Sequence, residues 1–267
     1  MNRLFIIIIF LFSSIQLFAE PSGYFVVANG IKFHIEESGK GEPLLLIHGG
    51  TESIDEVRRL MVPLSKSFRV IAIDLRAHGY SSGDFRTITY ENEYKDLLAI
   101  IQELDLDAIH FVGHSDGAIL GILFAERHPK QVISLAAISG NIHPDGVKTE
   151  VIEFLNNADP ETLPEKMRKN YLKHAQDLKD FPAYWNHMAN LWKTSPRMAT
   201  FDDLKNIEAS TLFIVADHDT IRLDHTIKMF ESTPDANLLV IPDATHALES
   251  MDLDILIPAI LNNAKKN

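Results

Sequence analysis

Residues 109–126 read IHFVGHSDGAILGILFAE, and the fold of the chain can be worked out from this stretch. A β-type apolar run leads into the pentad Gly113-His114-Ser115-Asp116-Gly117, and an apolar helical run follows it. The pattern G-x-S-x-G between a strand and a helix places a serine on a sharp turn with its hydroxyl exposed. Glycine is required at both ends of the pattern because the strand and the helix pass close together there. We therefore predict that Ser115 is a nucleophile; the alternative interpretation is a structural turn.

The length and composition of the chain are those of one large α/β domain with a full hydrophobic core. The chain has 267 residues, of which 46% are hydrophobic. Its formal net charge of -12 argues against nucleic-acid binding, because a phosphate backbone requires a basic surface. We expect a small-molecule substrate and no nucleic-acid partner, and the sequence leaves the oligomeric state open.

Residues 1–19 have the features of a secretory signal peptide. One positive residue, Arg3, precedes an apolar run over residues 4–12, and the small Ala19 ends the segment. The apolar run is short for a membrane span, which favours cleavage after Ala19; retention as a membrane anchor is the alternative. The chain has no cysteine and therefore no disulfide. We expect export to a bacterial periplasm or medium, with no stable membrane span after cleavage.

Strands and helices alternate through most of the chain. Two β-type runs flank Asn29-Gly30, which is typical of a two-residue hairpin turn. From residue 44 onward, apolar runs alternate with helical patterns, which favours a mostly parallel sheet with helices on both faces. The eight predicted strands are residues 24–28, 31–37, 44–47, 68–73, the run before the pentad, 132–138, 211–216 and 237–241. The predicted helices are residues 51–66, 89–104, the run after the pentad, 224–231 and 247–264.

The alternation stops between Asn141 and Asn206, where short helical patterns are separated by prolines. We predict a helical cap, or lid, at residues 141–206, inserted into an α/β core formed by residues 20–140 and 207–267. Either the lid side chains pack only among themselves, or some of them shape an apolar acyl or aromatic pocket over Ser115. The candidate pocket residues are Trp185, Met188 and Trp192.

With these elements in place, the chain resembles the α/β-hydrolase fold family from about residue 24 to its C-terminus. The resemblance rests on the pentad, on the family's triad order and on two loops, His48-Gly49-Gly50 and residues 74–82. In that family the triad follows the chain order nucleophile, acid, histidine. The resemblance therefore implies a catalytic triad of Ser115, Asp219 and His246.

Residue chemistry assigns the same roles. A serine hydroxyl needs a base to take its proton, and a neutral imidazole oriented by a carboxylate supplies that base. His246 follows an apolar strand and precedes a helical run, which places it on a loop at the same sheet edge as Ser115. Other carboxylates near strand ends, notably Asp217, compete for the orienting role. The family's pattern of a small residue, two variable residues and then the acid favours Asp219, since Ala216 stands at the first position.

The oxyanion hole is expected to use two backbone N–H groups. One belongs to Asp116, directly after the nucleophile, and the second to Gly49 or Gly50, between which the sequence does not decide. The Asp116 carboxylate has two interpretations, because it is in place either to cap the start of the helix or to meet a cationic group of the substrate.

Other polar residues favour structural roles. His48, His78 and His114 match structural or variable positions of the family, and Asp74 and Arg76 are interpreted as loop stabilisers. A polar cluster around Asp219 offers metal-binding side chains but lacks the spacing of known metal motifs, so we expect no metal and no cofactor. The members of that cluster are Asp217, His218, Asp219, Asp224 and His225.

The sequence therefore predicts a serine hydrolase that cleaves a small ester or related acyl compound through an acyl-enzyme on Ser115. Thioesters, lactones and amides stay open as substrates. Within the resembled family, a C–C bond hydrolase, a haloperoxidase or a lyase would use the same triad. A catalytically silent binding protein of the same fold is the alternative from another class.

Overall fold

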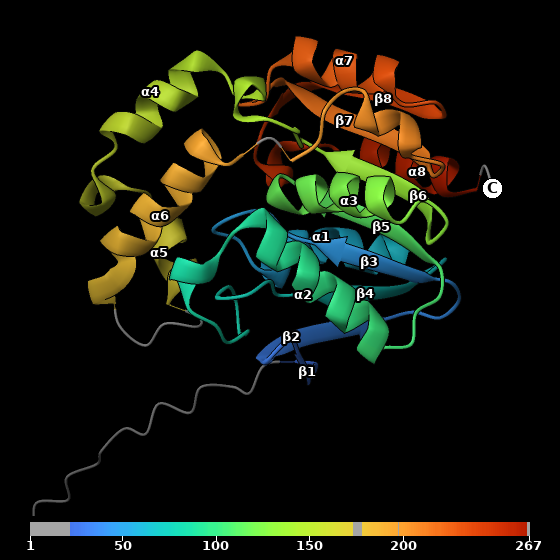
Figure 1. The fold of residues 1–267 in the computed structure, drawn as a ribbon, viewed down its shortest axis with the longest axis horizontal. Coiled ribbons are helices and arrows are strands. Elements are labelled where there is room, and N and C mark those ends of the chain that lie inside the picture. Colours follow the sequence, from blue (N-terminus) through green and yellow to red (C-terminus); the bar gives the residue numbers. More distant parts are fainter. Residues whose placement is uncertain (1–21, 173–177, 197, 266–267) are drawn as a thin grey trace, which may run out of the picture.

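The computed structural model describes residues 22–172, 178–196 and 198–265. They form one eight-stranded sheet in the order β1-β2-β4-β3-β5-β6-β7-β8 with helices on both faces (Figure 1), as the sequence predicts. The expected signal peptide at residues 1–19 lies outside the described residues. No helix in the described part of the chain is long and apolar enough to span a bilayer. The strands are β1 (Tyr24–Ala28), β2 (Ile31–Ser38), β3 (Pro43–Ile47), β4 (Arg69–Ile73), β5 (Ile109–His114), β6 (Val132–Ile138), β7 (Ser210–His218) and β8 (Ala236–Thr245).

The strand pairing combines an antiparallel edge with a parallel centre. β1 and β2 form the predicted hairpin, and Asn29 and Gly30 both have positive φ, 49° and 75°, as a two-residue hairpin turn requires. β2 also pairs antiparallel with β4, and all later neighbours pair in parallel. The parallel strands therefore end at a common edge of the sheet, where loops gather residues that are distant in sequence.

Side chains alternate between two hydrophobic cores, one on each face of the sheet. In β3, Leu45 and Ile47 face the core shared with α2 and α3, whereas Leu44 and Leu46 face the core shared with α1 and α8. Burial on both faces explains why the strands read as continuous apolar runs rather than as alternating ones. The eight α-helices of the described residues are α1 (Ile54–Leu64), α2 (Tyr90–Glu103), α3 (Asp116–Arg127), α4 (Thr149–Asn157), α5 (Glu165–Tyr171), α6 (Phe181–Thr194), α7 (Leu223–Ser232) and α8 (Leu253–Ala264).

Capping side chains determine where several helices begin. α1 starts at Ile54, later than predicted, because Ser53 and Glu56 form a capping box. Thr89 caps α2, because its side chain accepts from the backbone N–H of Asn92. The last helix begins at Leu253 rather than at residue 247, because a separate 3-10 turn and the capping Asp252 precede it. Pattern reading found these helices, but cap geometry set their first residues.

Between β6 and β7 the described chain forms α4, α5 and α6, which lie together to one side of the sheet (Figure 1). An isolated antiparallel bridge between Val147 and Ile221 joins the start of this segment to the loop after β7. α6 carries the most buried aromatic side chains of the segment, including Tyr184 and Trp185. The segment is hereafter called the cap.

The turn between β5 and α3 requires two glycines because backbone meets backbone there. A Cβ on Gly113 would lie 2.2 Å from the carbonyl oxygen of Gly117, and a Cβ on Gly117 would lie 2.5 Å from the carbonyl oxygen of Ile47. Backbone atoms cannot rotate away as side chains do, so any larger residue would force α3 off the sheet.

We predict that Gly113→Ala lowers the free energy of unfolding by about 1–3 kcal/mol, because the added methyl group overpacks this contact. Urea denaturation of the full chain measures the change. Gly30→Asn is the matched control: Gly30 has open space around its Cβ position, and asparagine tolerates its positive φ. Equal losses of stability in the two variants would contradict the steric explanation.

Candidate active site

Ser115 occupies a strained turn at the end of β5. It is the N-cap of α3, with φ 52° and ψ -116°, a region that non-glycine residues rarely adopt. Its backbone N–H donates to the carbonyl of Ile138 at 2.8 Å, which ties the turn to the neighbouring strand β6. The predicted nucleophile is thus held by the sheet in the conformation that a nucleophile elbow requires.

The three residues of the predicted triad form one hydrogen-bonded chain. His246 Nε2 lies 2.9 Å from Ser115 Oγ, and His246 Nδ1 lies 2.7 Å from Asp219 Oδ1. Ser115 and His246 are 131 positions apart in sequence, so only the tertiary fold brings them together. The distances suit proton transfer from the serine hydroxyl to an imidazole whose orientation the carboxylate fixes.

The surroundings of the Asp219 carboxylate favour its ionised form. It is buried, its Oδ2 accepts from Ser139 Oγ at 2.5 Å and from the backbone N–H of Ala216 at 3.1 Å, and its Oδ1 also accepts from the N–H of Ile221 at 3.1 Å. Burial raises the pKa of Asp219, but the contacts with His246 and these donors outweigh burial, and the pKa falls well below its usual range. Asp217, the competing acid, instead accepts from the backbone N–H groups of Asp243 and Ala244.

The loop after β3 lies directly beside the nucleophile. A Cβ on Gly49 would lie 3.0 Å from the Cβ of Ser115. The N–H of Gly49 is already engaged, because it donates to Glu52 Oε2 at 2.7 Å. A Cβ on Gly50 would meet the carboxylate of Asp116 at 2.3 Å, so Gly50 and Asp116 lie side by side at this edge.

Glu52 and His114 form an ion pair that joins the loops around Ser115. His114 Nδ1 lies 3.0 Å from Glu52 Oε2, and His114 Nε2 lies 2.8 Å from the backbone carbonyl of His246. Both ring nitrogens face acceptors, so the ring makes both bonds only when it carries two protons and a positive charge. The Glu52 carboxylate is accordingly the largest favourable influence on the pKa of His114, which rises to about 9 against burial, while the pKa of Glu52 falls to about 2.

Sequence reasoning missed this pair. It treated His114 as the variable residue of the pentad and did not consider Glu52. The two residues are 62 positions apart, and an acid near two glycines carries no local pattern that names its partner.

The Asp116 carboxylate contacts side-chain donors on α2 and α6 rather than the backbone N–H groups at the start of α3. Its Oδ1 accepts from Tyr90 Oη at 2.8 Å, and the indole N–H of Trp192 lies 3.0 Å from Oδ2 and 3.2 Å from Oδ1. Asp116 is 3% exposed, and burial raises its pKa despite these two donors. Through Trp192, the cap reaches the residue that follows the nucleophile.

The candidate pocket residues occupy two layers. Met188 and Trp192 contact the loop after β3, because a Cβ on Gly50 would lie 3.1 Å from the Met188 side chain and 2.8 Å from the Trp192 side chain. Trp185 lies behind them: it is 2% exposed, and its ring centroid is 5.8 Å from that of Trp192. The structure therefore places Met188 and Trp192 at the site and Trp185 in the cap core.

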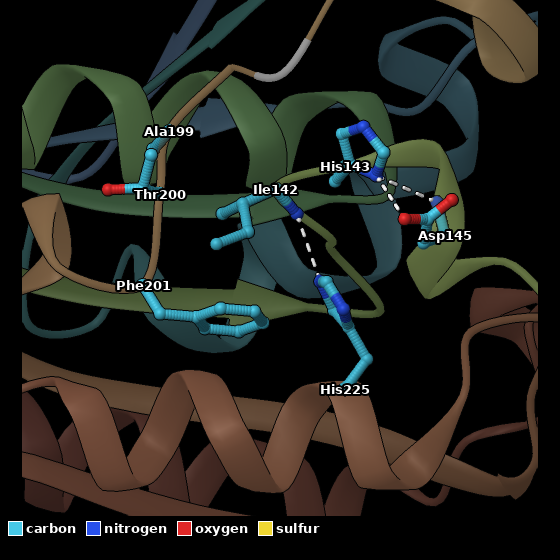
Figure 2. Close-up of a pocket in the computed structure, with 7 residues that line it drawn as sticks. All are labelled: Ile142, His143, Asp145, Ala199, Thr200, Phe201 and His225. Atoms are coloured by element: carbon cyan, nitrogen blue, oxygen red, sulfur yellow. Dashed lines mark hydrogen bonds and ion pairs between the residues drawn. The ribbon is translucent and has the colours of Figure 1, made fainter.

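A separate cavity of about 60 Å³ lies away from the triad, between the two segments that enter and leave the cap (Figure 2). Its volume is far below the roughly 300–1,000 Å³ of small-molecule sites. In Figure 2, the His225 ring points toward the backbone of Ile142, whose N–H donates to Nε2 at 3.3 Å. Burial lowers the pKa of His225 to about 4, so this ring is a neutral acceptor. The cavity is lined by Ile142, His143, Asp145, Ala199, Thr200, Phe201 and His225.

The polar cluster around Asp219 is divided among other partners. Asp219 binds His246, His225 faces a backbone N–H, and Asp224 pairs with Arg222. Within the residues that the structure describes, no group of three or more histidine, aspartate or glutamate side chains is arranged around a possible metal position.

Asp74 and Arg76 occupy structural positions. The Asp74 carboxylate lies 2.8 Å from His34 Nδ1 and accepts from the backbone N–H groups of Ile54 and Tyr80. Arg76 forms a buried two-point ion pair with Asp96 at 2.6 and 2.7 Å. Both geometries agree with the interpretation of these residues as loop stabilisers.

Fold and site geometry together define a class of protein. A protein-family model of the alpha/beta hydrolase fold matches residues 42–187, which is more than half of the chain. The chain therefore belongs to the α/β-hydrolase fold family.

Individual relatives show how widely this family varies. The chain is 27% identical over 264 residues to a putative non-heme chloroperoxidase of Synechocystis sp., covering 87% of this chain and 94% of that protein. It is 33% identical over 127 residues to a putative non-heme haloperoxidase of Mycobacterium phage D29, a match that spans 46% of each protein. A meta-cleavage product hydrolase from Pseudomonas fluorescens IP01 superimposes with a TM-score of 0.77 at 21% identity, covering 91% of this chain and 99% of that one. The last likeness shows the shared fold alone.

We predict that His114→Gln lowers the free energy of unfolding by about 3–5 kcal/mol near pH 6, because Glu52 would lose its cationic partner. His114 has a raised pKa in the folded chain, so its stabilising effect is complete below its unfolded pKa of about 6.5 and is lost as the pH rises through about 9. The stability difference between the wild type and the variant should therefore shrink between pH 6.5 and 9, as denaturant titrations at several pH values would measure.

His218→Gln is the control for this prediction, because the His218 side chain is 72% exposed. It should change stability by less than about 0.5 kcal/mol across the same range. A loss in His114→Gln that stays constant with pH would contradict a charged pair.

Proposed function

We propose that the protein is a serine hydrolase that cleaves small carboxylic esters through an acyl-enzyme on Ser115. The observation that carries the proposal is the hydrogen-bonded chain from Ser115 through His246 to Asp219 at 2.9 and 2.7 Å. Ser115 begins this series of hydrogen bonds at a strained strand-to-helix turn. There the serine hydroxyl is presented to substrate, and the start of α3 favours negative charge.

The reaction proceeds in two halves. In the first, His246 takes the hydroxyl proton as Ser115 attacks the carbonyl carbon, and then gives that proton to the leaving alcohol as the carbon–oxygen bond breaks. In the second, His246 takes a proton from water as that water attacks the acyl carbon, and then gives the proton to Ser115 Oγ as the acyl–oxygen bond breaks and the acid leaves. Throughout, Asp219 stabilises the imidazolium that forms on His246.

The negative oxygen of each tetrahedral intermediate is bound by two backbone N–H groups. One belongs to Asp116, the residue after the nucleophile. The second belongs to Gly50, because the N–H of Gly49 already donates to Glu52. Glu52 therefore acts indirectly: it holds the loop that presents Gly50 beside Ser115.

Thioesters, lactones and amides would follow the same path, and esters are favoured because an alcohol leaves more easily than an amine. A second candidate is perhydrolysis, which the names of the chloroperoxidase and haloperoxidase relatives favour. There hydrogen peroxide replaces water in the second half of the reaction and releases a peracid. Adding peroxide during ester turnover and measuring the ratio of peracid to acid distinguishes the two.

A fluorophosphonate probe tests the proposal against a catalytically silent binding protein. The probe reacts with a serine only when its base is in place. Stable labelling of Ser115 in the native chain supports the hydrolase, and an unlabelled native protein would favour the binding protein.

We predict that Asp219→Asn lowers turnover of a labelled ester by about 10²- to 10⁴-fold, because asparagine stabilises the wrong imidazole tautomer and removes the charge that supports His246. Asp217→Asn, two residues before Asp219, is the matched control and should lower turnover only slightly. Steady-state kinetics on both variants, with melting temperatures to confirm folding, measure the effect. A large loss of turnover in Asp217→Asn, together with near-normal turnover in Asp219→Asn, would require a different triad.

The cap acts as a lid in this proposal, with Met188 and Trp192 shaping the acyl pocket. We predict that Met188→Ala shifts the preferred acyl chain to longer esters, because its methyl group lies against the oxyanion loop. Trp185→Ala, one layer behind, should lower the free energy of unfolding by about 3–5 kcal/mol with little change in chain-length preference. Met188 is equally buried, so Met188→Ala should also lose about 2–5 kcal/mol, and the change in preference distinguishes the two variants. A panel of 4-nitrophenyl esters together with urea denaturation measures both. Uniform loss of activity in Met188→Ala would defeat the pocket assignment.

A further inference from the structure

The carboxylate of Asp116 is buried beside the nucleophile and forms no salt bridge with the residues that the structure describes. Its two hydrogen-bond donors, Tyr90 Oη and the indole N–H of Trp192, are both neutral groups. In the described part of the chain, no lysine or arginine forms an ion pair with Asp116. A buried carboxylate is costly unless a cation compensates it, so a missing cation in a candidate active site requires an explanation.

The lack of a cationic partner for Asp116 matters because its carboxylate lies close to the proposed oxyanion donors. Oδ2 of Asp116 would lie 2.3 Å from a Cβ on Gly50, and these two residues supply the proposed oxyanion donors. The carboxylate therefore lies next to the place where the substrate carbonyl becomes negatively charged. Two negative charges so close oppose each other, so a cation bound to Asp116 would favour the transition state in addition to the imidazolium that forms on His246.

A second buried acid leaves the region short of positive charge. Glu93 lies one turn after Tyr90 on α2; it is 2% exposed, and its Oε2 has no hydrogen-bond partner. The neighbouring cation, Arg76, is already bound to Asp96. Burial and the charge of Asp116 raise the pKa of Glu93 well above its usual value, and burial raises that of Asp116. A cation placed beside such a group lowers its pKa and favours the ionised form.

We propose that Asp116 determines substrate specificity by binding a positively charged amino group on the acyl part of the substrate, close to the scissile carbonyl. The substrate class is therefore esters of amino acids and of similar aminoacyl compounds. The inference rests on the proposed hydrolase function and narrows its substrate.

Trp192 holds the place of that amino group in the substrate-free protein. Its indole N–H contacts both carboxylate oxygens, but it is only partly buried and belongs to α6 of the cap. Movement of α6 therefore exchanges a neutral donor for a charged one. Hydrogen bonds to charged groups are stronger than those between neutral groups, which favours the exchange.

The test compares three 4-nitrophenyl esters of one size, derived from alanine, lactic acid and propionic acid. They place an ammonium, a hydroxyl or a hydrogen at the same carbon. Near pH 7 the α-amino group, with a pKa of about 7.7–8.0 in peptides, is largely charged. The alanine ester should exceed the propionate ester in kcat/KM by about 10- to 100-fold, the factor that a hydrogen bond to a charged group provides.

Asp116→Asn keeps the backbone N–H but removes the charge, and it should abolish or reverse this preference. Asp107→Asn removes an equal charge from an exposed position and should retain it. Equal rates for the alanine and propionate esters in the wild type, or an unchanged preference in Asp116→Asn, would overturn the proposal. A lactate ester as good as the alanine ester would also overturn it, because a neutral donor would then suffice.

A binding measurement covers the case in which the variant is inactive or no ester is turned over. Propylammonium should raise the melting temperature of the wild type more than propan-1-ol does, and this difference should vanish in Asp116→Asn. Equal shifts by the two compounds would overturn the inference. Hydrolysis of the propionate ester without an ammonium effect would support the hydrolase function and overturn the role of Asp116. An ammonium effect without any hydrolysis would overturn the hydrolase function and support ammonium binding by Asp116.

Discussion

The contact on which the site depends is the direct approach of α3 to the sheet at Gly113 and Gly117. Backbone carbonyls occupy the space that a Cβ would need at either glycine. This contact brings the first turn of α3 against the end of β3 and leaves Ser115 in its strained conformation. The position of the Ser115 hydroxyl at the start of α3, beside the loop of Gly49 and Gly50, follows from that one packing constraint.

Around this turn, a buried ion pair connects loops that the sheet only brings near each other. Glu52 holds the backbone of Gly49, and His114 holds the carbonyl of His246, so one charged pair links the oxyanion loop to the loop of the base. A charged pair at low exposure is sensitive to the loss of either partner. The positions of His246 and of the loop that contains Gly49 are therefore coupled, because the same ion pair contacts both.

The cap adds a second layer of control. Asn170 of α5 donates to the carbonyl of Thr51 at 3.2 Å, Tyr184 lies 3.1 Å from His78, and Trp192 reaches Asp116. Cap and core therefore meet at polar groups beside the nucleophile. If the cap acts as the proposed lid, its opening would change the partners of these groups and so couple substrate entry to the electrostatics of the site.

The sequence by itself predicted the eight-stranded sheet and the helical segment between β6 and β7, because periodicity and turn chemistry are local properties of the chain. The resemblance to the α/β-hydrolase fold family implied the set Ser115, Asp219 and His246. The sequence did not determine which glycine remains free for an oxyanion, nor the partner of Asp116. Both depend on side chains that are distant in sequence: Glu52 occupies Gly49, and Tyr90 and Trp192 turn Asp116 away from a helix cap. Only tertiary packing decides which distant donors and acceptors meet, because burial makes every unmatched polar group costly.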